Sequence, residues 1–110
     1  AFKLAEVFIR QKNASAAIAL IQRFSSKNPR DVQAWRLMQQ AANIDQQSPL
    51  RAINVLRYRA EVEYWSGWEE NAIKSLLHAQ RLVKDKNNAL LSAQVKIRLN
   101  EMQAERQLRI

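Results

Sequence analysis

The dipeptide Ala-Ile occurs three times in this chain, at residues 17–18, 52–53 and 72–73. Each copy lies a few residues into a predicted helix, and the first two copies are 35 residues apart. A period of about 34 residues built only from helices is typical of a solenoid, in which helix pairs bury their apolar faces by stacking on one another. The sequence therefore predicts a stack of helices that binds something, without a catalytic pocket.

The composition excludes most other architectures. One Gly and two Pro in 110 residues leave little material for hairpin turns, and 47% hydrophobic residues suffice for one core. We therefore expect a single all-α domain over residues 1–110. The chain has no Cys, and its longest apolar run, residues 16–21, is too short to cross a bilayer. Because residue 1 already lies in a periodic apolar pattern, we interpret the chain as the C-terminal fragment of a longer protein.

The spacing of apolar side chains predicts six antiparallel helices. Five repeat helices cover about residues 1–84, and a capping helix covers about residues 88–107. The second and third copies of Ala-Ile are only 20 residues apart, which is less than one period. We therefore expect one helix, from Pro49 to Trp65, to be shared by two neighbouring repeats.

Capping signals predict where these helices begin and end. The expected N-caps are Asn13 or Ser15 for the second helix, Asp31 for the third, and Ser48 for the fourth, with Pro49 at its first helical position. The single Gly, Gly67, is expected to end the fourth helix in a left-handed conformation.

The last predicted helix has a narrow apolar stripe, which consists of Leu91, Val95, Leu99 and Met102. Its other positions, among them Gln94, are mostly polar and carry both signs of charge, as at Lys96, Arg98, Glu101, Glu105 and Arg106. A polar outer face is what the terminal helix of a solenoid needs. We therefore expect a solvated cap with no helix partner of its own.

Several residues fall at the positions of a known repeat pattern, W-x2-L-G-x2-Y followed by A-x3-F and P. They are Leu4, Ala5, Phe8, Ala17, Ile21 and Pro29 in the first repeat, Trp35 in the second, and Leu56, Ala60, Gly67, Ala72, Leu76 and Ala79 in the third. On these residues the chain resembles the tetratricopeptide (TPR) repeat proteins. The resemblance implies a TPR-like α-solenoid.

A narrower resemblance covers residues 31–102. It rests on Trp35, the block Arg59-Ala60-Glu61, Tyr64, Gly67, Ala72-Ile73, the basic and polar stretch 81–88, and Arg98-Leu99. This part is similar to the C-terminal TPR region of the BepA-type periplasmic zinc metalloproteases, which act in assembly and quality control of outer-membrane proteins. The resemblance implies a periplasmic, chaperone-like accessory module beside a protease domain, docking substrates or outer-membrane assembly components. The residues alone fit the cytoplasm equally, and the zinc-binding H-E-x-x-H helix of that family is absent from this sequence.

The residue types needed for catalysis are scarce. One His and no Cys exclude a Cys-His pair and a His-rich zinc site, and one Gly excludes phosphate-binding loops. His78 is expected to be an ordinary surface or boundary residue, and Trp68 to pack at the start of the fifth helix. We therefore expect this chain to hold no catalytic residues, metal or cofactor, and not to be an enzyme by itself.

A groove lined by the first helices of successive repeats is the expected site. Its predicted lining residues are Arg36 and Gln40 in the second repeat, Arg57 and Glu61 in the third, and Glu6 and Arg10 in the first, with Asn43, Asn54 and Trp65 at its flanks. Arginines at equivalent places can bind carboxylates or peptide carbonyls. The alternative is that these residues are only the solvated faces of exposed helices.

The net charge of +8 suggests a rival function. Residues 1–60 contain ten Lys or Arg and three acids, whereas residues 61–110 contain eight and seven. A basic half attracts nucleic acid or anionic lipid. However, Phe8, Phe24 and Trp35 fall on predicted inner faces and not among the basic residues, where stacking platforms for bases would lie. We therefore expect a protein or peptide segment as the partner, with nucleic acid or an anionic surface as the alternative.

Overall fold

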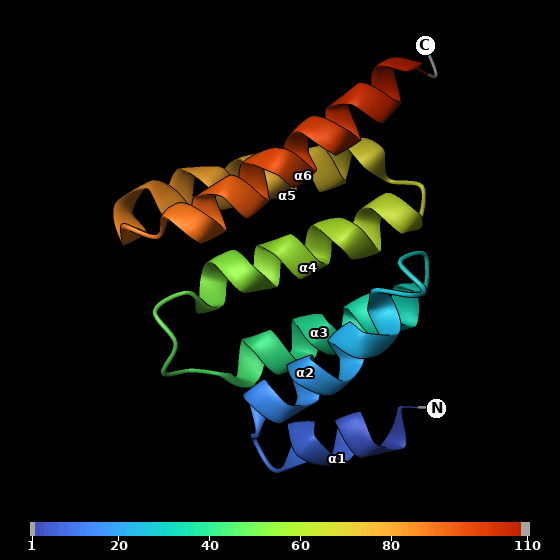
Figure 1. Ribbon diagram of the computed structural model, residues 1–110, viewed down its shortest axis with the longest axis vertical. Helices are drawn as coiled ribbons and strands as arrows, with labels where there is room; N and C mark the ends of the chain where they lie inside the picture. Colours follow the sequence, from blue (N-terminus) through green and yellow to red (C-terminus); the bar gives the residue numbers. More distant parts are fainter. Residues whose placement is uncertain (1, 109–110) are drawn as a thin grey trace.

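The computed structural model describes residues 2–108, and the secondary structure in this range is entirely helical (Figure 1). The helices are α1 (Lys3–Arg10), α2 (Ala14–Ser25), α3 (Val32–Ile44), α4 (Arg51–Trp65), α5 (Glu69–Val83) and α6 (Ala89–Leu108), with a short 3-10 segment, η1 (Lys84–Lys86), before α6. The predicted all-α class and the six predicted helices are confirmed for these residues. Ala1, where the first helix was expected to begin, lies outside the described residues.

Three of the predicted helix ends are correct. The side chain of Asn13 accepts a hydrogen bond from the backbone N–H three residues later at 3.3 Å, and that of Asp31 does the same at 3.2 Å. Asn13, and not Ser15, therefore caps α2, and Asp31 caps α3. Gly67 has a φ of 94°, in the left-handed region, directly after α4. These ends depend on local chemistry, which the sequence contains.

The predicted start of the fourth helix is wrong by two residues, because α4 begins at Arg51 and not at Pro49. The Ser48 hydroxyl accepts a hydrogen bond from the Leu50 backbone N–H at 3.2 Å, so it closes a turn before the helix. The Arg51 side chain then reaches back to Asn43, with bonds of 2.6 Å to the carbonyl and 2.7 Å to the side-chain oxygen. These contacts fix the α3–α4 loop in place of a simple cap.

The helices form two layers of unequal size. Helices α1, α3, α4 and α5 follow one another in a row, and each packs on the next. In front of this row, α2 packs on α1 and α3, and α6 packs on α5 (Figure 1). The front layer is therefore open between α2 and α6, and the molecule is flat, with extents of 43 × 32 × 19 Å.

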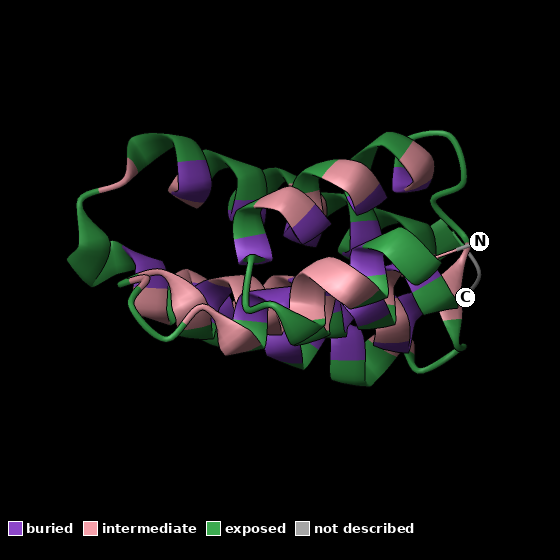
Figure 2. Ribbon diagram, turned by 90° about the horizontal axis from the view of Figure 1, so that it is seen from below, coloured by how far each residue is buried: buried purple, intermediate pink, exposed green. Residues whose placement is uncertain are grey.

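Helix α4 is central to the core and packs on both α3 and α5. Tyr58 belongs to a cluster with α1, α2 and α3, Ala60 and Tyr64 to a second cluster with α5 and α6, and Ile53 to a third with α5 and α6. Figure 2 shows that the buried residues lie mainly where helices face one another, with exposed residues on the outside. A single helix does occupy the segment where we expected one, and it is buried on several sides.

The three Ala-Ile copies are not structurally equivalent. Ala17 and Ala72 are fully buried, whereas Ala52 is exposed and its neighbour Ile53 is 1% exposed. Because α4 has neighbours on more than one side, its buried positions are out of step with those of α2 and α5. The dipeptide indicated helices correctly, but its spacing does not identify matching positions in a repeat.

Helix α6 differs from the expected solvated cap. Its predicted apolar stripe is buried as expected. However, α6 does have a helix partner, because it packs on α5, and Arg98 points inward to an ion pair instead of into solvent. Its outer face also carries Leu90 and Ile97, which are 71% and 61% exposed. Trp68, expected to pack at the start of α5, is 63% exposed.

Candidate functional site

The residues predicted to line one groove lie on separate surfaces. Glu6, Arg10 and Gln40 line a shallow hollow of about 410 Å³ between α1 and α3. Arg57 and Glu61 line a different pocket, of about 140 Å³, formed by α3, α4, α5 and α6. The two sets were expected to be equivalent, but α4 has a different set of neighbours from α1 and α3. The structure therefore does not bring all these residues together in one hollow.

The remaining predicted residues are dispersed in a similar way. Arg36 is exposed on α3 and lines neither of these two hollows. Asn54 lies beside the second pocket, where its side-chain oxygen accepts a hydrogen bond from Nη1 of Arg57 at 3.0 Å. Trp65 is half-buried at the end of α4 and contacts Glu61. Asn54 and Trp65 therefore flank the pocket of Arg57 and Glu61, whereas Arg36 does not.

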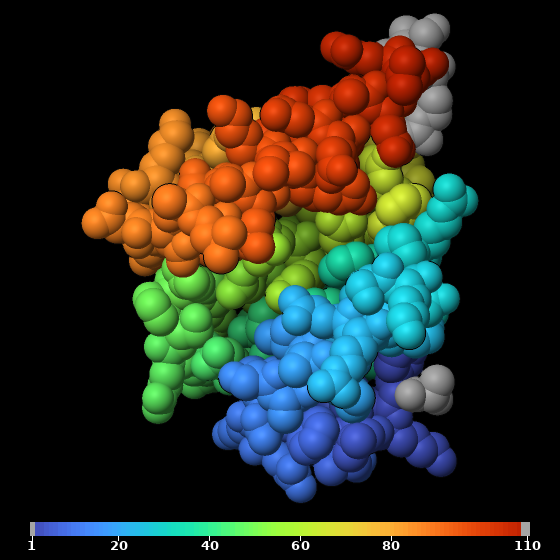
Figure 3. Space-filling model, in the orientation of Figure 1, coloured from blue at the N-terminus to red at the C-terminus, as the bar shows by residue number. Residues whose placement is uncertain are grey.

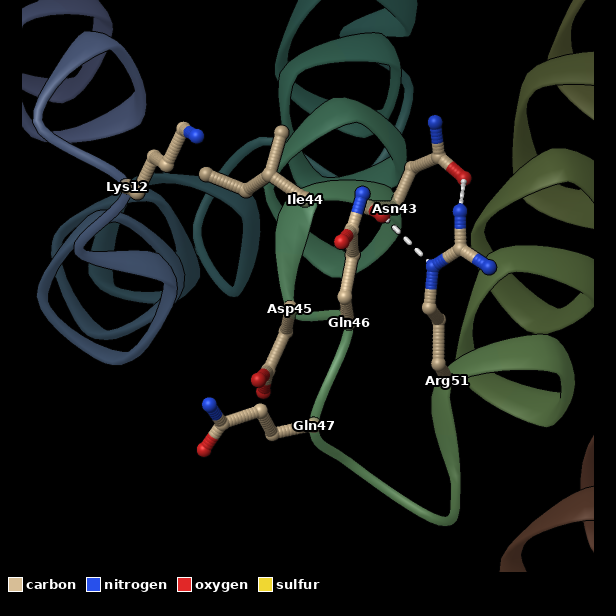
Figure 4. Close-up of a pocket in the computed structure, with 7 residues that line it drawn as sticks. All are labelled: Lys12, Asn43, Ile44, Asp45, Gln46, Gln47 and Arg51. Carbon is tan, nitrogen blue, oxygen red and sulfur yellow. Dashed lines mark hydrogen bonds between the residues drawn. The ribbon is translucent and has the colours of Figure 1, made fainter.

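Asn43 belongs to a third hollow, of about 510 Å³, between the α1–α2 and α3–α4 loops (Figure 4). Lys12 lies on one side of it and Arg51 on the other, with Asp45 between them. Arg51 is already bound to Asn43 by two hydrogen bonds, which Figure 4 draws as dashed lines. Because its arginine is used to fix the loop and its charges have both signs, this hollow offers no single chemistry to a ligand.

A longer hollow runs between α2 and α6, and we call it the central groove. In Figure 3 it separates the orange and red α6 from the blue α2, and its floor is formed by α3 and α4. The pocket of Arg57 and Glu61 described above lies on the α6 side of this groove. It is lined by Trp35 of α3, Arg57, Tyr58 and Glu61 of α4, Leu76 of α5, and Gln94, Val95 and Arg98 of α6. The central groove thus combines an apolar floor with a polar rim.

The rim on the α6 side is an ion pair. Nε and Nη2 of Arg98 donate to the two carboxylate oxygens of Glu61 at 2.7 and 2.9 Å. The Glu61 side chain is only 11% exposed and that of Arg98 27% exposed. Burial alone would lower the pKa of Arg98, but the hydrogen bonds and charge of Glu61, with those of Glu101, raise it above its ordinary value. The pair is bidentate and mostly shielded from water, so it holds α6 against α4.

One end of the groove carries a tryptophan with two cations close to its ring. Nε1 of Trp65 donates to Glu61 at 3.2 Å. The guanidinium carbons of Arg30 and Arg98 lie 5.5 and 5.9 Å from the centre of the Trp65 ring. These distances are within the range of cation–π attraction. Arg30 comes from the α2–α3 loop and Arg98 from α6, so Trp65 links the two walls of the groove.

The floor of the groove is aromatic. The rings of Trp35 and Tyr58 stack with their centroids 6.3 Å apart, and Nε1 of Trp35 donates to the carbonyl of Pro29 at 2.7 Å. Desolvation by burial raises the pKa of Tyr58, and the nearby charge of Arg57 opposes this shift. Tyr58 therefore keeps its proton at neutral pH and remains a hydrogen-bond donor.

The described residues offer no arrangement of metal ligands. Within residues 2–108 no three His, Cys, Asp or Glu side chains lie close enough together to hold a metal ion. His78 is exposed on α5, as expected. Among the same residues no helix combines the length and the apolar character needed to cross a membrane.

Comparison with known proteins gives no family for this chain. No protein-family model matches it, and no curated protein matches it significantly. The central groove must therefore be interpreted from its own residues.

Sequence reasoning did not assign Arg30, Tyr58, Gln94 or Arg98 to this site, and it gave Trp35, Leu76 and Val95 only a packing role. Gln94 and Arg98 were assigned to the solvated face of the last helix. Arg98 lies 37 residues after its partner Glu61, and no local pattern connects the two. Tyr58 directly follows the predicted residue Arg57. It lies on the helix that we expected two repeats to share, and this was the available signal that it could contact residues on both sides.

Proposed function

We propose that this chain is a non-catalytic module that binds an extended or exposed segment of another protein in the central groove. The observation that carries this proposal is the open front layer between α2 and α6, which leaves between them a groove with aromatic and apolar residues in its floor and arginines at its rim (Figure 3). Aromatic residues and arginines are the side chains that most often dominate binding at protein interfaces.

The wider role in this proposal rests on the sequence resemblance. By that resemblance, the chain is the TPR tail of a periplasmic zinc metalloprotease or chaperone that acts in outer-membrane protein assembly and quality control. Its partners are then substrates, a protease domain of the same protein and outer-membrane assembly components. The sequence that precedes residue 1 in the full-length protein tests this placement, since a metalloprotease helix there supports it and a DNA-binding domain counts against it.

The alternative function is attraction of nucleic acid or an anionic surface by the basic first half. Bases need exposed aromatic rings on which to stack. Trp65 lies beneath two guanidinium groups, and Trp35 is half-buried against Tyr58. The aromatic residues of the groove are therefore poor stacking platforms, which favours a protein segment.

A blocking substitution tests the proposal. Gln94 is exposed and lines the pocket, so Gln94→Trp fills the groove without disturbing the core. Gln103→Trp is the matched control, because Gln103 is exposed on the same helix and does not line the pocket. Segments of 12 residues are selected from a random displayed library on the unmodified chain. Their binding to all three proteins is measured by calorimetry, after circular dichroism has shown equal helicity.

The proposal expects selected segments with a Kd of about 100 μM or tighter, and loss of binding in Gln94→Trp alone. A library that yields no binder overturns it, as does equal binding by Gln94→Trp and the unmodified chain. Labelled oligonucleotides provide the test of the alternative. Tight binding that falls steeply with salt and is unchanged in Gln94→Trp would make the alternative the better explanation.

A further inference from the structure

The pocket in the central groove has the size of one aromatic ring. Its volume is about 140 Å³, and an apolar cavity of about 150 Å³ is known to hold a benzene molecule. Leu76 and Val95, each 1% exposed, form its base, and Trp35 and Tyr58 form its aromatic side. The pocket therefore suits a single planar apolar group better than a long aliphatic chain or a bulky polar one.

The charge at the mouth of this pocket is positive. Its one acid, Glu61, is held by the bidentate bonds from Arg98 and by Trp65. Arg57 forms no ion pair with a carboxylate within residues 2–108. Of its guanidinium nitrogens only Nη1 donates a hydrogen bond there, to the side chain of Asn54. An uncompensated guanidinium beside a low-dielectric pocket attracts a carboxylate.

A second donor lies next to Arg57. The guanidinium carbon of Arg57 is 5.7 Å from the centre of the Tyr58 ring. Tyr58 lines the same pocket, and its hydroxyl makes no hydrogen bond to another residue of the described range 2–108. The residue is buried as a whole, but its oxygen is not fully buried, because no fully buried side-chain oxygen or nitrogen of the described residues lacks a partner. Arg57 and Tyr58 thus bring two donor groups to the lining of one pocket.

We propose that the partner segment carries an aromatic residue directly beside an acidic one. The aromatic ring occupies the pocket between Trp35, Leu76 and Val95. The acidic side chain accepts hydrogen bonds from Arg57 and the Tyr58 hydroxyl. This inference rests on the interaction role proposed above and names the chemical class of the segment.

Synthetic peptides test this inference directly. The reference peptide has the core Asp-Phe-Asp in an uncharged Gly-Ser background, with both termini blocked. One comparison peptide has Asn-Phe-Asn, which removes the charge, and another has Asp-Ala-Asp, which removes the ring. A fourth peptide has Asn-Phe at its end with a free carboxylate, and it distinguishes a terminal carboxylate from a side-chain one. Binding to the full chain is measured by calorimetry.

The expected result is that affinity falls about ten-fold or more for either the Asn or the Ala peptide, because each loses one of the two contacts. Arg57→Met and Tyr58→Phe should reduce the preference for Asp over Asn, since neither side chain then donates as before. Tyr58→Phe keeps the buried ring, so its fold is retained. Arg81→Met is the matched control, because Arg81 is exposed on α5 and outside the pocket.

Equal binding of the Asp and Asn peptides overturns the inference, and so does an equal loss of preference in Arg81→Met, which would indicate general charge. Stronger binding of the free-carboxylate peptide than of the reference would also overturn it. If library segments bind in the groove without any preference for an aromatic-acidic pair, the inference fails while the proposed function stands. If neither the library nor the reference peptide binds, both fail.

Discussion

The ion pair between Glu61 and Arg98 should contribute more to stability than any other charge interaction described in the chain. Its two hydrogen bonds join α4 to α6, and both side chains are mostly removed from solvent. The substitution Arg98→Met keeps an unbranched, flexible apolar stem and removes the guanidinium with its charge. It leaves the Glu61 carboxylate, which is 11% exposed, with the Trp65 N–H as its remaining described partner.

The magnitude follows from the burial of the pair. Removing one member of a fully buried ion pair costs about 3–5 kcal/mol. The Arg98 side chain is 27% exposed, so water can reach the site and we expect a smaller loss, about 2 kcal/mol. For a domain of this size that loss lowers the melting temperature by about 8 °C. The double substitution Glu61→Leu with Arg98→Met should recover most of it, to within about 1 kcal/mol of the unmodified chain, because no charge is left unpaired.

Urea unfolding followed by circular dichroism at 222 nm measures these free energies. Lys96→Met is the control, since Lys96 is exposed on the same helix, and it should change stability by no more than about 0.5 kcal/mol. Two results would refute the reasoning. One is a loss in Arg98→Met no larger than in Lys96→Met, and the other is a double variant as unstable as Arg98→Met alone.

Three further predictions concern single residues. Trp35→Ala should destabilise the chain by about 3 kcal/mol, because it removes a stacked aromatic ring and the hydrogen bond to Pro29. His78→Ala is the control and should change stability very little. Similar melting temperatures for the two variants would contradict the assignment of Trp35 to a buried face and His78 to an exposed one. Burial raises the pKa of Tyr58 above 10.0, so the folded state keeps this proton longer than the unfolded state and the free energy of unfolding falls as the pH rises above 10. Tyr58→Phe should make that fall shallower in melting curves between pH 9 and 11, and parallel curves would refute it. Gly67→Ala should lower the free energy of unfolding in urea by about 1 kcal/mol, because alanine is strained at the φ of 94° found there. The added Cβ meets no atom within 4 Å, so backbone strain is the expected cause, and a neutral result would mean that the turn relaxes.

The sequence predicted those parts of the fold that depend on neighbours along the chain. Asn13, Asp31 and Gly67 act on backbone groups within a few residues, so their roles follow from residue type and spacing. The start of α4 could not be predicted in the same way. There the Arg51 side chain binds Asn43 in the preceding helix, and this longer contact, together with the turn at Ser48, delays the helix.

The candidate site was predicted less well, because it depends on how whole helices are placed. Arg57 and Glu61 were expected to be exposed partners of a ligand, and both do line the pocket. The sequence could not reveal that Arg98, 37 residues later, would neutralise Glu61. It also treated Arg36 and Arg57 as equivalent, although α3 and α4 have different neighbours. The spacing of a repeat identifies the helices. Which face of each helix is buried, however, depends on how the other helices pack around it.

The pairing of acids explains why some arginines of the central groove are neutralised and others are not. The ion pairs formed within residues 2–108 use Glu61, Glu63, Glu70 and Glu101, all of which follow residue 60. On the α6 side, Arg98 is therefore neutralised by two of these acids, Glu61 and Glu101.

Two other arginines of the central groove have no such compensation. Arg30 and Arg57 come from the first half of the chain, which has ten basic residues and only three acids, and neither arginine is in an ion pair within the described residues. A polyanion would be attracted to the basic half as a whole. A short acidic segment in the groove, by contrast, has one favourable orientation, with its carboxylate toward Arg57 and away from the Glu61–Arg98 pair. Because complementary charge mainly provides specificity, this asymmetry favours recognition of a defined protein segment over non-specific binding of anions.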